Sequence, residues 1–257
     1  AGFDGVIVEG KSEKPVYLLI DDGGFSLKDA TDLWGENPED VENQLRESHE
    51  DSRSVQIGIA GENLVNLSCL ISETRAAGSG GLGGVMGSKK LKAIVARGKN
   101  DFQIAHEKEF NDILKKIRQT VRTNPITGVD GTLSRFGTSL LVHRVNAAGM
   151  LPKDNFSGES MDFDEVDSFS GETVYEEYLE DKSACFACPT GCGRIIDTGS
   201  GETKGPEYES VAMLGPNSGF YEYVDEIVPL ADLCEEYGLD TISVGNVLGF
   251  ARDLGMV

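Results

Sequence analysis

Positive charge is scarce in this sequence. Its 257 residues include 23 lysines and arginines against 44 aspartates and glutamates, a formal net charge of −21 at pH 7. Nucleic acids and anionic membrane surfaces attract basic proteins, so this balance excludes both as expected partners. Hydrophobic runs are short, and none approaches the roughly 18 apolar residues of a membrane-spanning helix. These features predict a cytoplasmic protein.

Histidine and cysteine are also sparse. The three histidines are scattered and form no ligand set, whereas three of the five cysteines fall within eight residues. This distribution fits metal ligation in a reducing compartment better than a disulfide framework. The chain has no initiating methionine and begins and ends in predicted secondary structure, so we expect it to be part of a longer protein.

The clustered cysteines are Cys185, Cys188 and Cys192, in a C-x2-C-x3-C pattern. Pro189 and Gly191 interrupt the run, which favours a loop that folds its thiols around one object. An iron–sulfur cluster suits thiolates at this spacing, a structural zinc is the rival, and unrelated thiols or a disulfide knuckle are the third interpretation.

A [4Fe–4S] cluster takes four thiolates, so three cysteines leave one ligand to be found. Cys69 lies in an apolar run, and Cys234 lies in a segment whose apolar residues recur at helical spacing. Both patterns favour buried structural cysteines. We therefore expect the fourth ligand to lie outside this chain.

The apolar pattern predicts an α+β fold, with a β-rich N-terminal domain in residues 1–98 and a mainly helical domain in residues 99–257. The glycine-rich stretch at residues 78–87 makes the first of these the expected cofactor-binding domain. A hairpin is predicted after Asp21, and a helix is predicted to begin at Asn37-Pro38. The predicted strands are residues 6–8, 16–20, 55–59, 91–96 and 194–196. The predicted helices are residues 110–121, 133–145 and 224–233 and a segment after residue 240, with a loop at 153–172.

Six glycines lie between Gly78 and Gly87, with Arg75 before them and Lys89 and Lys90 after them. Glycine allows backbone N–H groups to approach phosphate oxygens, so the stretch favours a cradle for a phosphate-bearing cofactor. A flexible linker is the alternative. The spacing does not fit a Walker A loop. No strand–glycine–helix unit is predicted around it, which argues against a dinucleotide-binding fingerprint.

Two glutamates, Glu207 and Glu209, flank Tyr208 at the start of an apolar segment. A carboxylate drawn toward apolar surroundings can act as a proton-transfer group. Solvated surface glutamates are the alternative.

Four stretches together resemble the tungsten-containing aldehyde:ferredoxin oxidoreductases. They are residues 60–94, the cysteine loop 185–192, residues 205–209 and residues 238–243. The opening 34 residues are similar to the family's first domain, so the resemblance covers nearly the whole chain. It implies that a large C-terminal part lies outside it.

The resemblance implies a tungsten (or molybdenum) ion held by two molybdopterin dithiolenes, with Mg²⁺ bridging the pterin phosphates. It also implies a [4Fe–4S] cluster bound by Cys185, Cys188 and Cys192, with a fourth cysteine outside this chain. The family's pterin motif D-x-x-G-L-[CD] begins with a glutamate here. The cofactor-binding residues expected on these grounds are Arg75, Ala76, Gly78, Gly80, Gly81, Gly83, Glu235, Gly238, Leu239 and Asp240.

The activity implied by the resemblance is that of an anaerobic oxidoreductase. A small aldehyde would be oxidised to a carboxylic acid, with electrons passing through the cluster to ferredoxin or a similar carrier. Glu207 or Glu209 would help to activate water, and the resemblance is compatible with a homodimer. The alternatives are a relative that reduces an aromatic acyl-CoA ring, a non-catalytic iron–sulfur electron-transfer subunit and a zinc-stabilised binding module.

Overall fold

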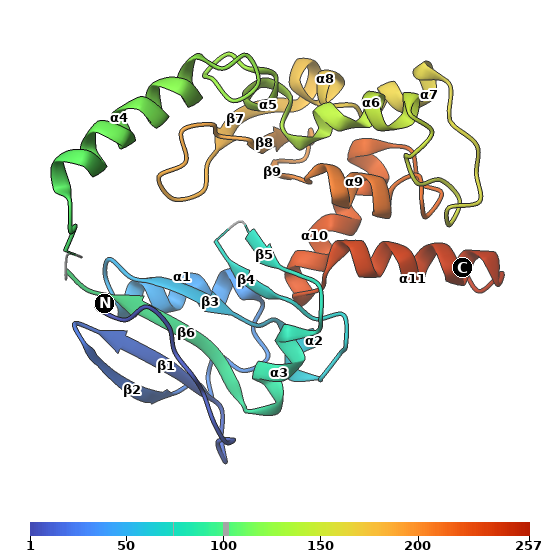
Figure 1. The fold of residues 1–257 in the computed structure, drawn as a ribbon. Helices are drawn as coiled ribbons and strands as arrows, with labels where there is room; N and C mark the ends of the chain where they lie inside the picture. The colour runs from blue at the N-terminus through green and yellow to red at the C-terminus, as the bar shows by residue number, and fades with distance from the viewer. Residues whose placement is uncertain (74, 100–102) are drawn as a thin grey trace. The chain divides into compact units, whose positions relative to one another are not determined.

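The computed structural model describes residues 1–73, 75–99 and 103–257 (Figure 1). The chain divides into two compact units, each made of two segments. Unit 1 contains Ala1–Gln103 and Leu233–Val244, and unit 2 contains Ile104–Asp232 and Gly245–Val257. The chain therefore leaves unit 1 and returns to it about 130 residues later.

Unit 1 is built on a six-stranded mixed sheet in the order β2-β1-β6-β3-β4-β5. β1 pairs in parallel with β6, and the other neighbouring strands are antiparallel. Asp22 (φ 41°) and Gly23 (φ 86°) have left-handed backbones that close the predicted hairpin. The strands are β1 (Val16–Asp21), β2 (Gly24–Asp29), β3 (Arg53–Gln56), β4 (Leu70–Ser72), β5 (Arg75–Ala77) and β6 (Leu91–Arg97).

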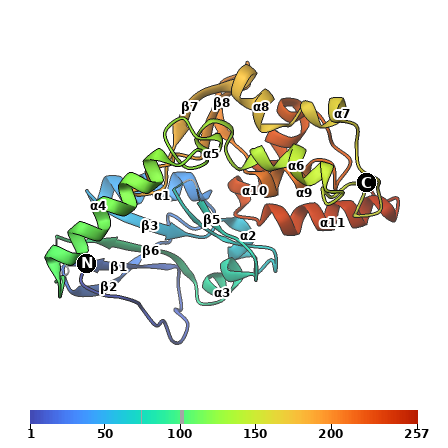
Figure 2. The same ribbon diagram turned by 45° about the horizontal axis from the view of Figure 1, so that its top comes forward.

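Alternating side chains give this sheet a hydrophobic core on each face. On one face, Leu19 and Val95 pack with Val41 and Leu45 of α1. On the other face, residues of β1 and β6 pack with Met86 of α3. In Figure 2, α1 lies beside β3, and α3 lies near one end of β6. The helices of unit 1 are α1 (Pro38–Ser48), α2 (Ile59–Glu62) and α3 (Leu82–Ser88).

A buried ion pair links β6 to α2. The side chain of Lys92 is fully buried and donates to the carboxylate of Glu62, which also accepts the N–H of Gly35 at 3.0 Å. Lys92 Nζ donates a further hydrogen bond to Glu36 O at 2.9 Å. Burial lowers the pKa of Lys92, and the Glu62 carboxylate opposes that shift. The pair is thus satisfied by several partners, as buried charges require.

Two strand predictions in unit 1 need correction. Residues 6–8 form no strand, and Ile7 is 91% exposed, because this apolar run has no neighbouring strand to pair with in the described part of the chain. The strand predicted at 55–59 ends at Gln56, and α2 begins at Ile59. The strands predicted at 16–20 and 91–96 are confirmed as β1 and β6.

Unit 2 is mainly helical, with a three-stranded antiparallel sheet in the order β7-β8-β9. Its core gathers buried apolar side chains from the sheet and the helices, including Val142, Phe169, Ile196 and Val211. The strands are β7 (Leu179–Ser183), β8 (Gly193–Asp197) and β9 (Glu202–Gly205). The helices before the sheet are α4 (Glu107–Thr123), α5 (Thr132–Phe136), the 3-10 helix η1 (Thr138–Leu141), α6 (Val142–Ala147), α7 (Phe163–Asp167), α8 (Gly171–Thr173) and the π-helix η2 (Val174–Tyr178).

After the sheet come α9 (Tyr208–Leu214), the π-helix η3 (Tyr223–Ile227), α10 (Val228–Tyr237) and α11 (Thr241–Asp253). The divisions between the two units fall inside α10 and α11. The single helix predicted at 133–145 is interrupted at Gly137, whose φ of 63° is incompatible with a continuous helix. The predicted loop 153–172 contains the helix α7. Asp162 is the N-cap of this helix and forms a capping box with Glu165.

The predicted α+β class is confirmed by the mixed sheet of unit 1 and the helices of unit 2. The amphipathic helix predicted at 110–121 is confirmed as α4. Within the described residues, every helix is too short or too polar to cross a bilayer.

We predict that Lys92→Met destabilises the protein by about 3–5 kcal/mol, because it leaves the Glu62 carboxylate buried without its cation. Lys92→Met/Glu62→Gln should recover much of this loss, since glutamine still accepts the Gly35 N–H. Urea unfolding followed by circular dichroism measures the effect. Lys14→Met is the control, because its ion pair with Asp29 is exposed. Equal unfolding midpoints for Lys92→Met and the parent would contradict a stabilising role for the pair.

Candidate functional site

The glycine-rich stretch forms a turn between β5 and α3 in unit 1. Gly80 (φ 105°) and Gly81 (φ 69°) have left-handed backbones that disfavour side chains. A Cβ atom on Gly81 would lie 2.8 Å from Asn66 O. Arg75 is half-buried and Ala76 is exposed, both on β5, which leads into the turn. The turn therefore presents bare backbone directly after an arginine.

The sequence prediction that no strand–glycine–helix unit surrounds these glycines is wrong, because β5 precedes the turn and α3 follows it. The strand escaped prediction because it has only three residues, too few for a period-2 pattern. β5 is an edge strand paired antiparallel with β4. A dinucleotide-binding βαβ unit has parallel strands, so this unit is of another kind.

Residues 238–240 join the same unit through backbone contacts with residues 67–69. The N–H of Cys69 donates to Gly238 O, and the N–H of Asp240 donates to Leu67 O, both at 2.9 Å. Ser68 and Leu239 form a β-bridge between these two contacts. The structure thus brings the predicted pterin-binding residues 238–240 against a segment that lies about 170 residues earlier in the chain.

Asp240 borders directly on the glycine turn. A Cβ atom on Gly78 would lie 2.7 Å from Asp240 Oδ1, so only glycine fits there without displacing the carboxylate. Asp240 is buried, and its Oδ2 accepts hydrogen bonds from the backbone and hydroxyl of Ser243 at the start of α11. One carboxylate oxygen therefore caps a helix, while the other faces the turn.

Other predicted cofactor residues differ in exposure. Glu235 is half-buried on α10. Gly83 is buried in α3, where a Cβ atom would lie 2.7 Å from Cys69 O, so close packing explains this glycine. Gly238 is buried, with a φ of 72°, and a Cβ atom there would lie 2.8 Å from Gly58 N. These glycines allow backbone segments to meet behind the turn.

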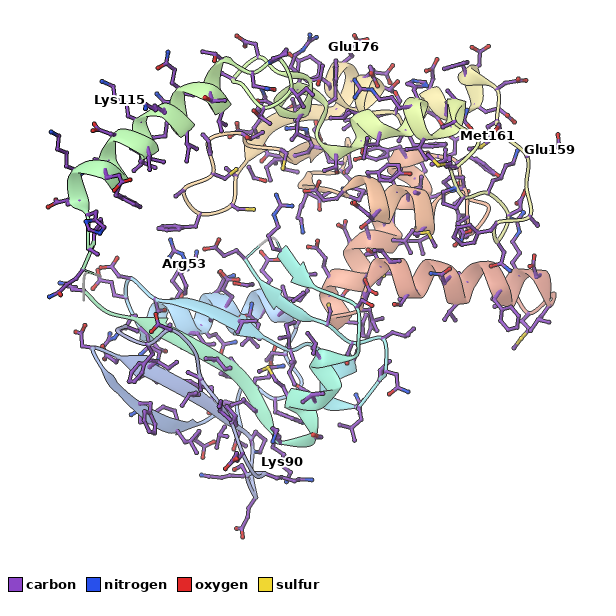
Figure 3. All side chains as sticks on the ribbon, in the orientation of Figure 1. Arg53, Lys90, Lys115, Glu159, Met161 and Glu176 are labelled. Carbon is purple, nitrogen blue, oxygen red and sulfur yellow. The ribbon has the colours of Figure 1, made fainter. Side chains whose placement is uncertain are left out.

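Lys89 and Lys90 do not add charge to the glycine turn, contrary to the sequence argument. They follow the C-terminal end of α3, whereas the turn precedes its N-terminal end. Lys90 is labelled in Figure 3. Lys89 Nζ donates to Gly10 O at 3.0 Å, and Lys90 Nζ donates to Glu13 O at 2.5 Å. The helix separates them from the turn because its seven residues rise about 10 Å.

The three clustered cysteines lie in unit 2, on the loop between β7 and β8. Cys185 and Cys188 are exposed and Cys192 is partly exposed. The backbone forms a turn from Cys185 to Cys188, in which the N–H of Cys188 donates to Cys185 O at 2.9 Å. Left-handed backbones at Ala187 and Gly191 bend the loop on both sides of Cys188. The donor set is therefore accessible and belongs to a single loop.

The structure does not gather these thiols at one point. Among the residues it describes, no set of three or more histidine, cysteine, aspartate and glutamate side chains is placed to hold a metal ion. The remaining cysteines, Cys69 and Cys234, are buried as predicted, and burial raises the pKa of each thiol to about 12. They therefore remain protonated at neutral pH and belong to the core of unit 1.

Glu207 and Glu209 have different surroundings in unit 2. Glu209 is exposed, whereas Glu207 is half-buried at the start of α9. The hydroxyl of Thr138 donates to Glu207 Oε2 at 2.5 Å and accepts the N–H of Tyr208 at 2.9 Å. Glu207 also lines a narrow pocket together with Cys192. The pocket links one predicted catalytic glutamate to one predicted cluster ligand.

Several other residues of this pocket were missed from the sequence, among them Thr138, Arg194 and Tyr223. Thr138 and Tyr223 reach it only through folding and carry no local signal. Arg194 did carry a local signal in the sequence, because it is a cation directly after the cysteine motif, in Cys192-Gly193-Arg194.

Two family sequence models match the chain. The model described as the aldehyde ferredoxin oxidoreductase N-terminal domain matches residues 1–98, and that for domains 2 and 3 of the same family matches residues 112–255. The tungsten-containing aldehyde ferredoxin oxidoreductase of Pyrococcus furiosus is 40% identical over 99% of this chain. The chain spans 42% of that relative's length.

Two other relatives carry different descriptions. The WOR-like subunit of an aliphatic sulfonate oxidoreductase from Pyrococcus furiosus is 33% identical over 99% of this chain, which spans 43% of its length. Among solved structures, the active-site complex BamBC of benzoyl coenzyme A reductase with 1,5-dienoyl-CoA gives a TM-score of 0.77 at 26% identity. That match covers 95% of this chain and 39% of the other.

We predict that Gly87→Ala prevents α3 from packing on α2. A Cβ atom at this position would lie 1.9 Å from Gly61 O, a backbone atom that cannot rotate away. The expected loss of stability is about 1–3 kcal/mol or more, measured by thermal unfolding. Gly5→Ala is the matched control, because no atom lies within 4 Å of its added Cβ. If both variants melt like the parent, the close packing of the two helices is not required.

Proposed function

Because the chain belongs to the aldehyde ferredoxin oxidoreductase family, we propose that the full-length protein oxidises an aldehyde to a carboxylic acid. The reaction takes place at a tungsten centre held by two pterins, and electrons leave through a [4Fe–4S] cluster to ferredoxin or a similar carrier. The 40% identity to tungsten-containing aldehyde ferredoxin oxidoreductases supports the metal and the substrate class.

The meeting of the glycine turn with residues 238–240 is the observation on which the pterin assignment rests. A pterin phosphate needs cations and N–H donors when it leaves water. Arg75 can hold a phosphate with two hydrogen bonds from its planar guanidinium group. No atom lies within 4 Å of a Cβ atom built on Gly80, so the backbone there is open to the approach of a phosphate and its Mg²⁺. Asp240 faces the same turn and is proposed to contact a pterin.

The cysteine loop fits an iron–sulfur cluster by the chemistry of its donors. Cys185, Cys188 and Cys192 have accessible thiols on one loop, and no other described cysteine is accessible. We propose that a cysteine beyond this chain completes the set. When bound, the tungsten–pterin group would supply two-electron oxygen-transfer chemistry, and the cluster would supply one-electron transfer.

Glu207 is the better placed of the two candidate bases. Its carboxylate is half-buried and is oriented by the Thr138 hydroxyl, whereas Glu209 is exposed. An oriented carboxylate at Oε2 can take a proton from a water molecule as that water attacks the substrate carbonyl. Glu209, in the first turn of the helix that Glu207 caps, is proposed to assist.

Reduction of an aromatic acyl-CoA ring is the second candidate. The benzoyl coenzyme A reductase complex shares the fold over 95% of this chain, so the scaffold is compatible with that reaction class. Anaerobically purified full-length protein distinguishes the two. Aldehyde-dependent reduction of ferredoxin supports the first candidate, and its absence together with reduction of benzoyl-CoA supports the second.

We predict that Cys188→Ser in the full-length protein abolishes the brown chromophore near 400 nm, because serine does not replace a thiolate ligand of iron. Iron and sulfide content should fall from about four of each per chain. Cys234→Ser is the control, because this cysteine is buried in unit 1. Full colour and iron in Cys188→Ser would exclude this loop as the cluster site.

We predict that Arg75→Ala and Gly81→Val lower the tungsten-to-iron ratio while leaving iron unchanged. Arg75→Ala removes the phosphate partner, and Gly81→Val places a β-branched side chain in a left-handed position. The measurement is metal analysis of the purified variants, with Gly5→Ala as control. Equal loss of both metals would indicate misfolding. An unchanged tungsten-to-iron ratio with full activity would show that the turn is a linker and does not bind the cofactor.

A further inference from the structure

Arg194 is a buried cation beside the cysteine loop. It lies on β8, two residues after Cys192, and is 4% exposed. Its guanidinium donates to four carbonyl oxygens at 2.9–3.4 Å, two at the end of the cysteine loop and two on α5. These acceptors are Gly191 O, Gly193 O, Leu133 O and Ser134 O. The side chain thus ties the third-cysteine end of the loop to a helix.

One donor of this guanidinium remains unused. Nε–H of Arg194 is buried and has no acceptor among the described residues. The nearest atoms to a Cβ built on Gly137 are Arg194 Nε at 3.0 Å and Cys192 O at 3.1 Å. Gly137 has a φ of 63°, so its backbone also favours glycine. This glycine allows the chain to pass close to both Cys192 and Arg194.

The charge of Arg194 persists despite its burial. A guanidinium with an ordinary pKa above 12 stays protonated in proteins. A buried charge of this kind is weakly screened and acts strongly on its neighbours.

We propose that Arg194 is a positioning residue that raises the reduction potential of the cluster bound by the cysteine loop. This inference rests on the proposed function, because it requires that cluster. Reduction adds one electron, and hence one negative charge, to the cluster. A nearby buried cation stabilises the reduced state, and a sulfur atom would provide the acceptor that Nε–H lacks. Net charge and hydrogen bonds to sulfur are established determinants of cluster potential.

The test is a redox titration with dithionite of the full-length protein, followed by EPR of the reduced cluster. Arg194→Gln removes the charge and retains an amide donor, whereas Arg194→Lys retains the charge. Lys182→Gln is the matched control, because Lys182 is the register partner of Arg194 on β7 and is exposed. Its ammonium donates to Ser134 Oγ at 3.4 Å, and its side chain is exposed, so water screens its charge.

For Arg194→Gln we expect about a tenfold loss in the equilibrium constant for reduction, about 59 mV for a one-electron couple. Arg194→Lys should shift less, and Lys182→Gln should match the parent. A parent-like potential in Arg194→Gln with full iron and sulfide content overturns the inference. A parent protein without any iron–sulfur signal overturns the proposed function instead.

A second measurement applies if the variants lose the cluster. In the parent protein labelled with ¹⁵N-arginine, pulsed EPR of the reduced cluster should detect coupling to an arginine nitrogen. Absence of this coupling overturns the role of Nε–H. If Arg194→Lys keeps its cluster, the coupling to the arginine nitrogen should disappear. A coupling that persists in this variant would come from another arginine and would overturn the role of Arg194 Nε–H.

Discussion

Two backbone hydrogen bonds hold the discontinuous unit 1 together. They join Cys69 to Gly238 and Leu67 to Asp240, across about 170 residues of sequence. Buried N–H and C=O groups must be paired, so this contact fixes the register between the two segments. Without it, Asp240 would not face the glycine turn. The proposed pterin site therefore depends on backbone pairing before any side chain contributes.

Glycines make this pairing possible by allowing backbones to approach closely. A Cβ atom on Gly58 would lie 2.4 Å from Tyr237 O, and one on Gly87 would lie 1.9 Å from Gly61 O. Behind these contacts, the buried Lys92 and Glu62 pair anchors α2 to β6. The glycine turn thus leads into a helix, α3, that packs on α2, and the ion pair holds α2 to the sheet.

Much of the fold could be predicted because its signals are local. Short apolar runs defined β1 and β6, and the 3.6-residue period of apolar residues defined α4. The predictions failed where tertiary contacts decide. β5 has only three residues, and the apolar run at residues 6–8 lacks a strand partner. The predicted helix 133–145 is interrupted at Gly137, which packs against Arg194. No local sequence pattern reveals this contact.

The candidate site was predictable in its donors but not in its arrangement. Clustered thiols and glycines stand out by type and spacing. The separation of Lys89 and Lys90 from the glycine turn could not be predicted without knowing the length of α3. The hydrogen bond from Thr138 to Glu207 joins residues that lie 69 positions apart in the sequence. Whether Asp240 faces a turn or water is likewise decided by the pairing of residues 67–69.

The discontinuity of unit 1 also orders the events of biosynthesis. A ribosome that has just released residue 103 must still add about 130 residues before Leu233 emerges. At 5–20 residues per second, this takes roughly 7 to 26 seconds. During that interval the backbone groups of Leu67 and Cys69 have no partner strand. Nascent chains therefore pass through a stage in which this edge is open to chaperones and to other chains.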